Sequence, residues 1–260
     1  MRTNILQAKK ALLVLFVLLL PLVASAAKVE IDGIWYNLVS KAKQAEVTYK
    51  GDSYDSYDDK YSGSITLPAT VTYDGVAYSV ASIGNYAFYN CSSLTAITIP
   101  EGVTSIGNGV FNGCSSLTTI TLPESVTSIG SYAFYGCTSL TAITLPEGVR
   151  SIGYCAFNDC SSLTAITCHA VTPPTITSYT FKGVDKGIPV YVPAGSVEAY
   201  KEAKYWSEFT NYVGIEAGID KSQLTTGSEQ LTIYDLRGRR VTDTERGGIY
   251  IVGGKKVIIK

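Results

Sequence analysis

The stretch from Glu124 to Pro146, ESVTSIGSYAFYGCTSLTAITLP, specifies the architecture, because its pattern recurs along the chain every 23 residues. Equivalent positions hold the same residue type in four consecutive copies. These positions are Ile83, Ile106, Ile129 and Ile152; Phe88, Phe111, Phe134 and Phe157; Cys91, Cys114, Cys137 and Cys160; and Leu94, Leu117, Leu140 and Leu163. A fixed period of this length is typical of solenoids, in which each repeat forms one coil and stacks on the next.

Each repeat contains two β-prone segments, Val-Thr-Ser-Ile-Gly and Leu-Thr-Ala-Ile-Thr-Leu-Pro, joined by the short aromatic turn Ala-Phe-x-x-Cys. Side chains alternate between the two faces of a strand. In one coil this alternation predicts an inward set made of Leu117, Ile120, Leu122, Val126, Ile129 and Phe134. A single coil cannot bury such a set alone, so the sequence predicts a mainly β repeat solenoid of stacked coils.

The repeat pattern extends over residues 64–193, from Ile65-Thr66-Leu67-Pro68 to Val190-Tyr191-Val192-Pro193. Two of the spacings between the prolines that end each repeat depart from the 23-residue period. Pro68 and Pro100 are 32 residues apart, because a hairpin around Asp74-Gly75 is predicted over Val71–Tyr78. Pro146 and Pro193 are 47 residues apart, and His169 stands where the intervening proline is expected.

Solenoids expose their terminal core, so atypical capping units are expected at both ends. Residues 27–63 are the predicted N-terminal cap, and residues 194–214 are the predicted C-terminal cap. In the second cap, Ser196 is the expected N-cap of a helix over Val197–Tyr205. Trp206, Phe209 and Tyr212 would then cover the last coil. The polar residues 215–230 are expected to form a linker.

The spacing Leu-x-x-Ile-x-Leu-Pro, together with Ala-Phe-x-x-Cys, resembles the BspA-like bacterial leucine-rich repeats. The likeness covers residues 33–214, from Gly33-Ile34-Trp35-Tyr36 to Val192-Pro193-x-x-Ser196. This resemblance implies a curved leucine-rich repeat solenoid with a parallel sheet on its concave face. It also implies a cell-surface protein, an adhesin that binds host matrix proteins or other cells.

The first 26 residues have the pattern of a signal peptide. Arg2, Lys9 and Lys10 precede the apolar run Ala11–Val23, which is followed by Ala24-Ser25-Ala26. About 20 apolar residues are needed to cross a bilayer, and this run is shorter. We therefore expect cleavage after Ala26, and an exported mature chain without a transmembrane segment.

The last 30 residues, 231–260, form a compact β pattern with seven basic and three acidic side chains. Composition alone is equally consistent with a solvated edge of a small sheet. The motifs Tyr234-Asp235-Leu236, Gly248-Ile249-Tyr250-Ile251-Val252 and the terminal Lys-Lys-Val-Ile-Ile-Lys resemble the sorting domains of type IX secretion substrates. That resemblance implies outer-membrane translocation and attachment to the cell surface.

The composition excludes several classes of protein. With 46% hydrophobic and 17% charged residues the chain is not of the disordered type, and a net charge of -1 argues against a nucleic-acid partner. His169 is the single histidine, and Cys168 and His169 are neighbours in one strand, so their side chains point to opposite faces and form no dyad. We expect no enzyme, no catalytic residue and no cofactor.

The six cysteines predict a ladder of buried free thiols, because four of them occupy equivalent repeat positions. Disulfides between neighbouring coils are the alternative, as is structural zinc held by Cys155, Cys160, Cys168 and His169. Cys155 aligns with Tyr132 and is expected to face outward. The acidic cluster of Asp52, Asp55, Asp58 and Asp59 is interpreted as a solvated loop, since its spacing does not match a calcium loop.

The candidate binding surface is a strip of small side chains between the buried positions of each Leu-Thr-Ala-Ile-Thr-Leu segment. Its members are Ala96, Thr98, Thr119, Thr121, Ala142, Thr144, Ala165 and Thr167. Residues 78–169 contain only five charged side chains, which favours contact with a flat protein partner or a glycan over electrostatic capture. The alternative is that threonine simply favours strands.

Two other functions stay open. In a glycan-binding accessory protein of the cell surface, the tyrosines of the outer turns would contact the ligand. These tyrosines are Tyr86, Tyr89, Tyr132, Tyr135 and Tyr154. The third possibility is an architectural envelope protein without a ligand.

Overall fold

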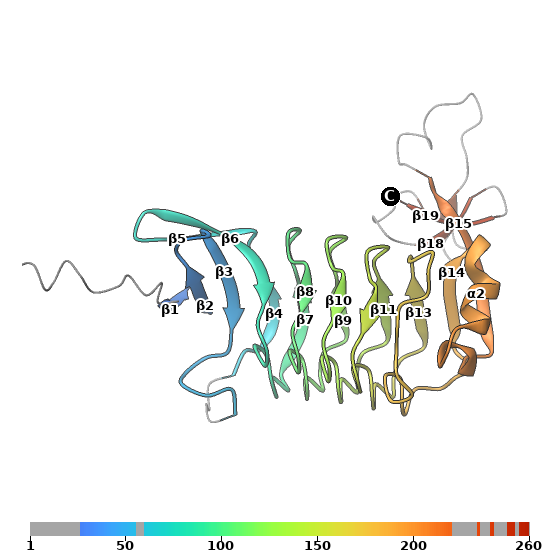
Figure 1. The fold of residues 1–260 in the computed structure, drawn as a ribbon, viewed down its shortest axis with the longest axis horizontal. Coiled ribbons are helices and arrows are strands. Elements are labelled where there is room, and N and C mark those ends of the chain that lie inside the picture. The colour runs from blue at the N-terminus through green and yellow to red at the C-terminus, as the bar shows by residue number, and fades with distance from the viewer. Residues whose placement is uncertain are drawn as a thin grey trace, which may run out of the picture.

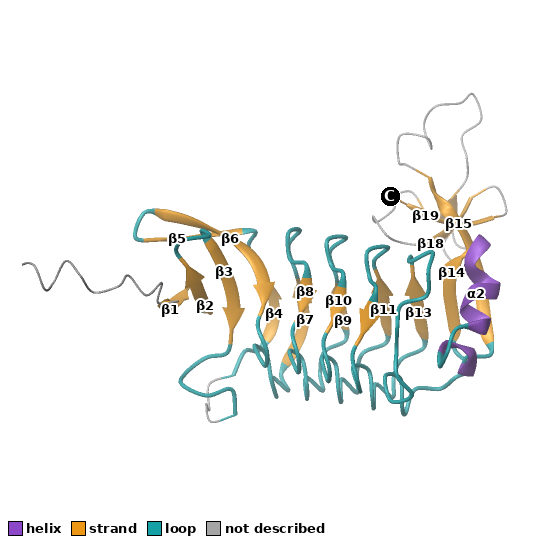
Figure 2. Ribbon diagram, in the orientation of Figure 1, coloured by secondary structure: helices purple, strands orange, loops and turns teal. Residues whose placement is uncertain are grey.

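The computed structural model describes residues 27–55, 60–219, 233–234, 240–241, 249–252 and 255–259. Its coils lie side by side along one long axis (Figure 1). The coils consist of strands and turns, and the helical segments among the described residues lie at the C-terminal end (Figure 2). One continuous hydrophobic core runs from the N-terminal cap to the C-terminal cap. The prediction of a mainly β repeat solenoid is confirmed.

The first row of strands comes from the Leu-Thr-Ala-Ile-Thr segments, and its hydrogen-bonded neighbours run parallel. The row comprises β4 (Gly63–Thr66), β7 (Leu94–Thr98), β9 (Thr119–Thr121), β11 (Ala142–Leu145), β13 (Ala165–Cys168) and β14 (Pro189–Pro193). Ile97 pairs with Ile120, and Ile143 pairs with Ile166. Because paired residues are one period apart, each side chain lies beside its own counterpart, and the repeat becomes columns of like side chains.

The second row of strands comes from the Ser-Ile-Gly segments. It comprises β6 (Val76–Ile83), β8 (Ser105–Ile106), β10 (Ser128–Ile129) and β12 (Ser151–Ile152). The glycine that follows each isoleucine is required by the close approach of neighbouring coils. A Cβ atom on Gly153 would lie 2.4 Å from the backbone nitrogen of Ser131, a distance that real Cβ atoms essentially never reach.

A ladder of stacked phenylalanines fills the interior of the coils. Its members, all buried, are Phe88, Phe111, Phe134, Phe157 and Phe181. Neighbouring ring centroids are 4.9–5.4 Å apart, and the ring planes deviate from parallel by at most 20°. Tyr61 closes the N-terminal end of the ladder at 4.9 Å from Phe88, and Trp206 closes the other end at 5.5 Å from Phe181. Side chains from both caps therefore complete the column.

The repeat cysteines lie beside this ladder, and all six cysteines are buried free thiols, as predicted for all but Cys155. Three thiols donate hydrogen bonds to phenylalanine carbonyl oxygens of the preceding coil. The donor–acceptor distances are 3.1 Å for Cys114–Phe88, 3.2 Å for Cys137–Phe111 and 3.1 Å for Cys160–Phe134. Burial raises the pKa of Cys160 to about 12, so this thiol stays protonated at physiological pH.

The expectation that Cys155 faces outward is wrong, because its side chain is only 4% exposed. The backbone there has a positive φ of 54°, as it has at the equivalent Tyr132. Tyr132 is too large to fit under the turn, and it projects. The small thiol fits, and it accepts a hydrogen bond of 3.5 Å from Nδ2 of Asn158.

The N-terminal cap extends the second row of strands. β1 (Ala27–Ile31), β2 (Ile34–Val39) and β3 (Gln44–Thr48) form an antiparallel meander, and β3 then pairs in parallel with β6. The predicted hairpin is confirmed, since β5 (Thr70–Tyr73) pairs with β6 in antiparallel fashion. Its turn residues Asp74 and Gly75 have φ values of 47° and 74°, the left-handed conformation that a two-residue hairpin loop needs.

The C-terminal cap contains η1 (Ala194–Ser196), α2 (Val197–Glu202) and η2 (Trp206–Glu208). The helix ends at Glu202, earlier than expected, because Ala203 has an extended backbone. Ser196 makes no side-chain capping bond, since it belongs to the preceding 3₁₀ turn and its own backbone is near-helical. Trp206 and Phe209 are buried over the last coil as predicted, and Trp206 Nε1 donates to the carbonyl oxygen of Pro174 at 2.8 Å. Tyr212 is half-buried.

The strand β15 (Asn211–Ile219) pairs with β14 and extends five residues into the segment that we expected to be a linker. The rest of that segment and the signal-peptide residues 1–26 lie outside the described residues. The tail contributes β16 (Ile233–Tyr234), β17 (Arg240–Val241), β18 (Ile249–Val252) and β19 (Lys255–Ile259). Because β19 pairs with β15 in parallel, the tail strands join the same sheet as β14.

Candidate functional site

The predicted strip lies on the first row of strands, where the register brings its members together. Ala96 and Thr98 of β7 pair with Thr119 and Thr121 of β9. In the same way, the β11 residues Ala142 and Thr144 pair with Ala165 and Thr167 of β13. β9 and β11 are consecutive in the stack, and Thr141 Oγ1 donates to the carbonyl oxygen of Thr118 at 3.5 Å across them. The strip is therefore one surface built from four coils.

Exposure within the strip is uneven. Thr98, Thr119, Thr121, Ala142 and Thr144 are exposed, and Ala96 and Ala165 are half-buried. The expectation that Thr167 projects into solvent is wrong, because its side chain is 8% exposed. Thr167 pairs with Tyr191 of β14, where the repeat pattern ends and a larger side chain stands beside the threonine. The open part of the strip thus lies on β7, β9 and β11.

A row of threonines fixes the backbone that carries the strip. Thr118 Oγ1 donates to the carbonyl oxygen of Thr95 at 3.1 Å, and Thr164 Oγ1 donates to that of Thr141 at 3.0 Å. By contrast, no hydrogen bond joins the hydroxyls of Thr98, Thr121 and Thr144 to another residue in the described part of the chain. These three hydroxyls are therefore available to a partner.

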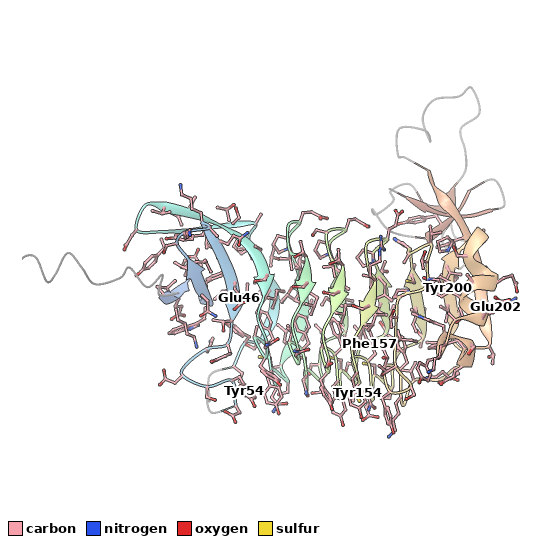
Figure 3. The ribbon with its side chains drawn as sticks, in the orientation of Figure 1. Glu46, Tyr54, Tyr154, Phe157, Tyr200 and Glu202 are labelled. Carbon is pink, nitrogen blue, oxygen red and sulfur yellow. The ribbon has the colours of Figure 1, made fainter. Side chains whose placement is uncertain are left out.

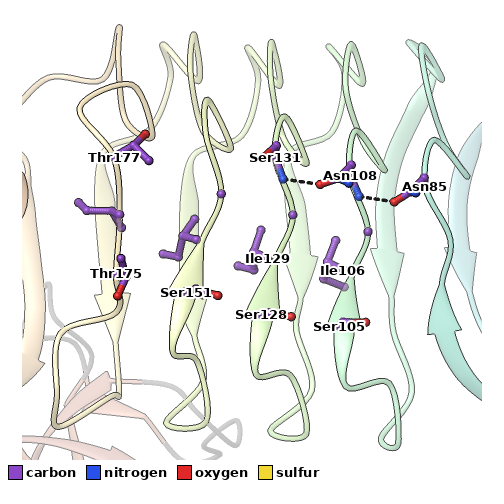
Figure 4. Close-up of a pocket in the computed structure, with 15 residues that line it drawn as sticks. Asn85, Ser105, Ile106, Asn108, Ser128, Ile129, Ser131, Ser151, Thr175 and Thr177 are labelled. Carbon is purple, nitrogen blue, oxygen red and sulfur yellow. Dashed lines mark hydrogen bonds between the residues drawn. The ribbon is translucent and has the colours of Figure 1, made fainter.

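The second row of strands carries a surface that the sequence did not single out. A shallow hollow with a volume of about 370 Å³ crosses β8, β10 and β12 (Figure 4). We call it the hydroxyl groove. Its polar lining consists of Asn85, Ser105, Asn108, Ser128, Ser131, Ser151, Thr175 and Thr177. The signal available in the sequence was the recurrence of a polar serine before each buried isoleucine; Ser151 is exposed, and Ser105 and Ser128 are half-buried.

A second ladder fixes one edge of the groove. The Oδ1 atom of Asn85 accepts a hydrogen bond from the backbone nitrogen of Asn108 at 2.7 Å, and Oδ1 of Asn108 accepts one from Ser131 at 2.8 Å (Figure 4). These bonds hold the side-chain oxygens of the two asparagines against the next coil. Each side-chain amide is then left with its NH₂ group as the hydrogen-bond donor.

The outer tyrosines form two separate groups. In the first, Tyr54 stacks on Tyr86 at 4.2 Å and meets Tyr89 edge-on at 5.2 Å. The second group, which we call the tyrosine row, consists of Tyr132, Tyr135, Tyr154 and Tyr179. The intervening coil has Gly109 at the tyrosine position, and this separates the groups. Tyr54 and Tyr154 lie along the same edge of the solenoid (Figure 3).

The tyrosine row is the more exposed group. Tyr132, Tyr154 and Tyr179 are 39%, 41% and 43% exposed, and they account for three of the seven exposed large hydrophobic residues in the described chain. Ring centroids are 5.5 Å apart for Tyr132 and Tyr154, and 5.2 Å apart for Tyr154 and Tyr179. Lys182 Nζ lies 5.3 Å from the centre of the Tyr179 ring.

The residues considered for metal binding do not come together in the described chain. Within the ranges that the structure covers, no three His, Cys, Asp or Glu side chains are grouped as metal ligands would be. Asp58 and Asp59 of the acidic cluster lie outside those ranges. Cys168 is buried, with its Sγ 3.1 Å from the hydroxyl of Tyr200, and burial raises its pKa to about 11. This thiol has a structural place in β13, where it contacts Tyr200 of the C-terminal cap.

The stacked coils, the strand registers and the buried leucines define a leucine-rich repeat solenoid. Residues 76–201 match the family model of the BspA type leucine rich repeat region, in six copies. Among curated proteins, none matches the chain. In the described residues, no helix is both long and apolar enough to cross a membrane.

Solved structures with this fold come from several bacteria. A leucine-rich repeat protein of T. pallidum is 23% identical, with a TM-score of 0.53, over 74% of this chain and 87% of that one. The pneumococcal vaccine antigen PcpA is 19% identical, with a TM-score of 0.52, over 74% of this chain and 48% of that one. A leucine-rich repeat protein of Bacteroides capillosus is 24% identical over 55% of this chain and 99% of that one, with a TM-score of 0.44. For the first two, whose TM-scores exceed 0.5, the likeness concerns the fold alone.

Proposed function

We propose that this chain is an exported cell-surface protein, an adhesin that binds matrix proteins or other cells through the strip. The observation that carries the proposal is the open part of the strip, where Thr98, Thr121 and Thr144 present unpaired hydroxyls in register on a rigid sheet. A flat surface of this kind suits a protein partner that is itself flat. The signal-peptide pattern in residues 1–26 supports export.

Two further observations support a place at the cell surface. One protein with the same fold is named a vaccine antigen. The tail, residues 231–260, resembles a type IX sorting domain, and such a domain attaches its protein to the outer surface. An architectural envelope protein without a ligand is the simplest competing function.

The size of the strip implies weak binding by a single copy. Strands lie about 4.8 Å apart, so the four coils of the strip give a surface roughly 20 Å long. That supports an interface of at most about 800 Å² on each partner. The eight strip residues include no aromatic or arginine side chain to act as a hot spot. Adhesion would therefore depend on many copies that act together on one surface.

The test introduces charge into the centre of the strip. The double variant Thr121→Lys, Thr144→Lys should fold, because both side chains are exposed, and it should reduce adhesion of cells to immobilised matrix proteins or to other cells. The matched control is Thr70→Lys, Thr72→Lys, which adds the same charge to two exposed threonines of the β5 hairpin. Equal adhesion of both variants and the wild type, at matched surface expression, would contradict a binding role for the strip.

A further inference from the structure

We propose that the tyrosine row and the hydroxyl groove together bind an extended, uncharged polysaccharide, at a site distinct from the strip. The groove lies on the second row of strands, whereas the strip lies on the first. The site therefore requires none of the strip residues, and it gives the protein a second class of partner.

The two surfaces join at Tyr154. Asn85, Asn108 and Ser131 line one edge of the groove, and they are successive members of one 23-residue column. The next member of that column is Tyr154. Its ring packs 5.5 Å from Tyr132 and 5.2 Å from Tyr179, so the column that begins as the groove edge continues into the tyrosine row.

The lining of the groove selects for an uncharged ligand. All fifteen residues that line it are asparagine, serine, threonine, glycine or isoleucine, so a charged ligand would find no counter-ion there. Serine and threonine hydroxyls both donate and accept hydrogen bonds, and the asparagine amides donate. Sugar hydroxyls have the same dual capacity, and they can pair with such a surface without an unmatched charge.

The tyrosines supply the apolar part of sugar recognition. A tyrosine combines a large apolar ring with a polar hydroxyl, and the electron-rich face of its ring attracts the polarised C–H groups of a pyranose. Tyr132 keeps its side chain at a backbone φ of 58°, and Gly109 has nearly the same φ, 59°, at the equivalent position. For a residue other than glycine this conformation costs roughly 1–2 kcal/mol. The same left-handed conformation recurs at Tyr86 and at the buried Cys155, so it belongs to the repeat turn, and at Tyr132 it projects a residue that is 39% exposed.

The period of the surface also matches a polymer. Successive coils present the same hydroxyl about every 4.8 Å. This step is close to the rise of one pyranose unit in an extended β-linked chain. Successive units of a β-1,4-linked chain are turned by about half a revolution, so equivalent hydroxyls on one side recur every second unit and would meet Ser105 and Ser151.

An extended polypeptide fits the same surface less well. Peptides that bind to sheets commonly add a strand at a free edge, where backbone groups are unpaired. The central strand β10 pairs on both sides, with β8 and with β12. A peptide lying across this face would have to find partners for its own amides among side chains alone.

Calorimetric titration of the purified protein with cellohexaose and laminarihexaose, two uncharged β-linked probes, tests the proposal. The variant Tyr154→Ser, Tyr179→Ser should weaken binding at least tenfold, and Ser128→Glu should do the same by placing a charge in the groove. Tyr73→Ser is the matched control, because Tyr73 is 38% exposed in the distant β5 hairpin; it should bind within twofold of the wild type. Thermal melting confirms that each variant is folded.

Several outcomes would overturn the polysaccharide site. The first is that the wild-type protein binds neither hexasaccharide. The second is that it binds a charged oligogalacturonate equally well, and the third is that the folded tyrosine variant binds as tightly as the wild type. Binding of a polar extended peptide in place of the sugars would also do so. The strip variant Thr121→Lys, Thr144→Lys should leave sugar binding intact, so failure of this site and failure of the adhesion role can be told apart.

Discussion

The ring of Phe134 stacks on the ring of Phe157 with centroids 4.9 Å apart and planes 4° from parallel. The two residues are one repeat apart, and both are fully buried. Each phenylalanine in the column thus forms part of the packing surface of the next coil. The stability of the solenoid therefore depends on an unbroken column, and a cavity in one coil affects its neighbours on both sides.

Replacing Phe134 with alanine should lower the unfolding free energy by about 3–5 kcal/mol, because it opens a cavity in the middle of the ladder. Phe134→Leu should cost clearly less, since most of the volume is retained. Urea denaturation of the three proteins measures both changes. Equal destabilisation by alanine and leucine would show that loss of the stacked ring, and not cavity volume, determines the cost.

Gly153→Ala should destabilise the fold strongly, because the added Cβ would lie within 2.4–2.8 Å of backbone atoms in the preceding coil. A loss of about 2 kcal/mol or more is expected, on the order of other overpacked core substitutions. Gly195→Ala is the matched control, since a Cβ atom added at Gly195 would have no neighbour within 4 Å. The stability of this control should stay within about 0.5 kcal/mol of the wild type. Thermal denaturation compares the two.

The thiol ladder should resist alkylation in the native protein. Burial excludes the reagent and keeps the thiols protonated, whereas after denaturation the same cysteines should react without a reductant. Mass spectrometry of iodoacetamide adducts before and after addition of guanidinium gives the measurement. A Cys91–Cys114 or Cys137–Cys160 linked peptide would contradict the free-thiol ladder.

Stability should decrease as the pH rises above about 9, the ordinary thiol pKa. Burial raises the pKa of Cys160 to about 12 in the folded chain, so above pH 9 the unfolded chain loses this proton first and is favoured. Each such thiol lowers the unfolding free energy by up to about 1.4 kcal/mol per pH unit across that window. Denaturation midpoints between pH 8 and 11 measure the slope. Cys160→Ala should flatten it, and an unchanged slope would assign the effect to the buried tyrosines.

Deleting residues 231–260 should leave the solenoid folded. The C-terminal end of the core is already covered by Trp206 and Phe209, and β15 keeps its pairing with β14 after β19 is lost. If the tail is a sorting domain, the deletion should also move the protein from the cell surface to the periplasm. Cleavage of the truncated protein by an external protease on intact cells would show that sorting does not require the tail.

Residue identity at a fixed period specifies most of the fold. Ile106, Phe111, Cys114 and Leu117 recur every 23 residues, and equal residues in parallel strands pair with one another, so the register and the ladders follow from the sequence. The Asp74-Gly75 hairpin was also predictable, because its turn chemistry is local.

Where the repeat is interrupted, packing between coils determines which side chains are buried, and the sequence pattern does not reveal this burial. Thr167 is buried because its neighbour in the next strand is Tyr191 and not another threonine, and Cys155 turns inward because a small thiol fits where Tyr132 does not. The groove along β8, β10 and β12 likewise depends on how side chains from different coils meet. A repeat pattern specifies which residues share a column. Exposure and shape depend on the actual size of the neighbours in space, and those neighbours lie a full coil away in the sequence.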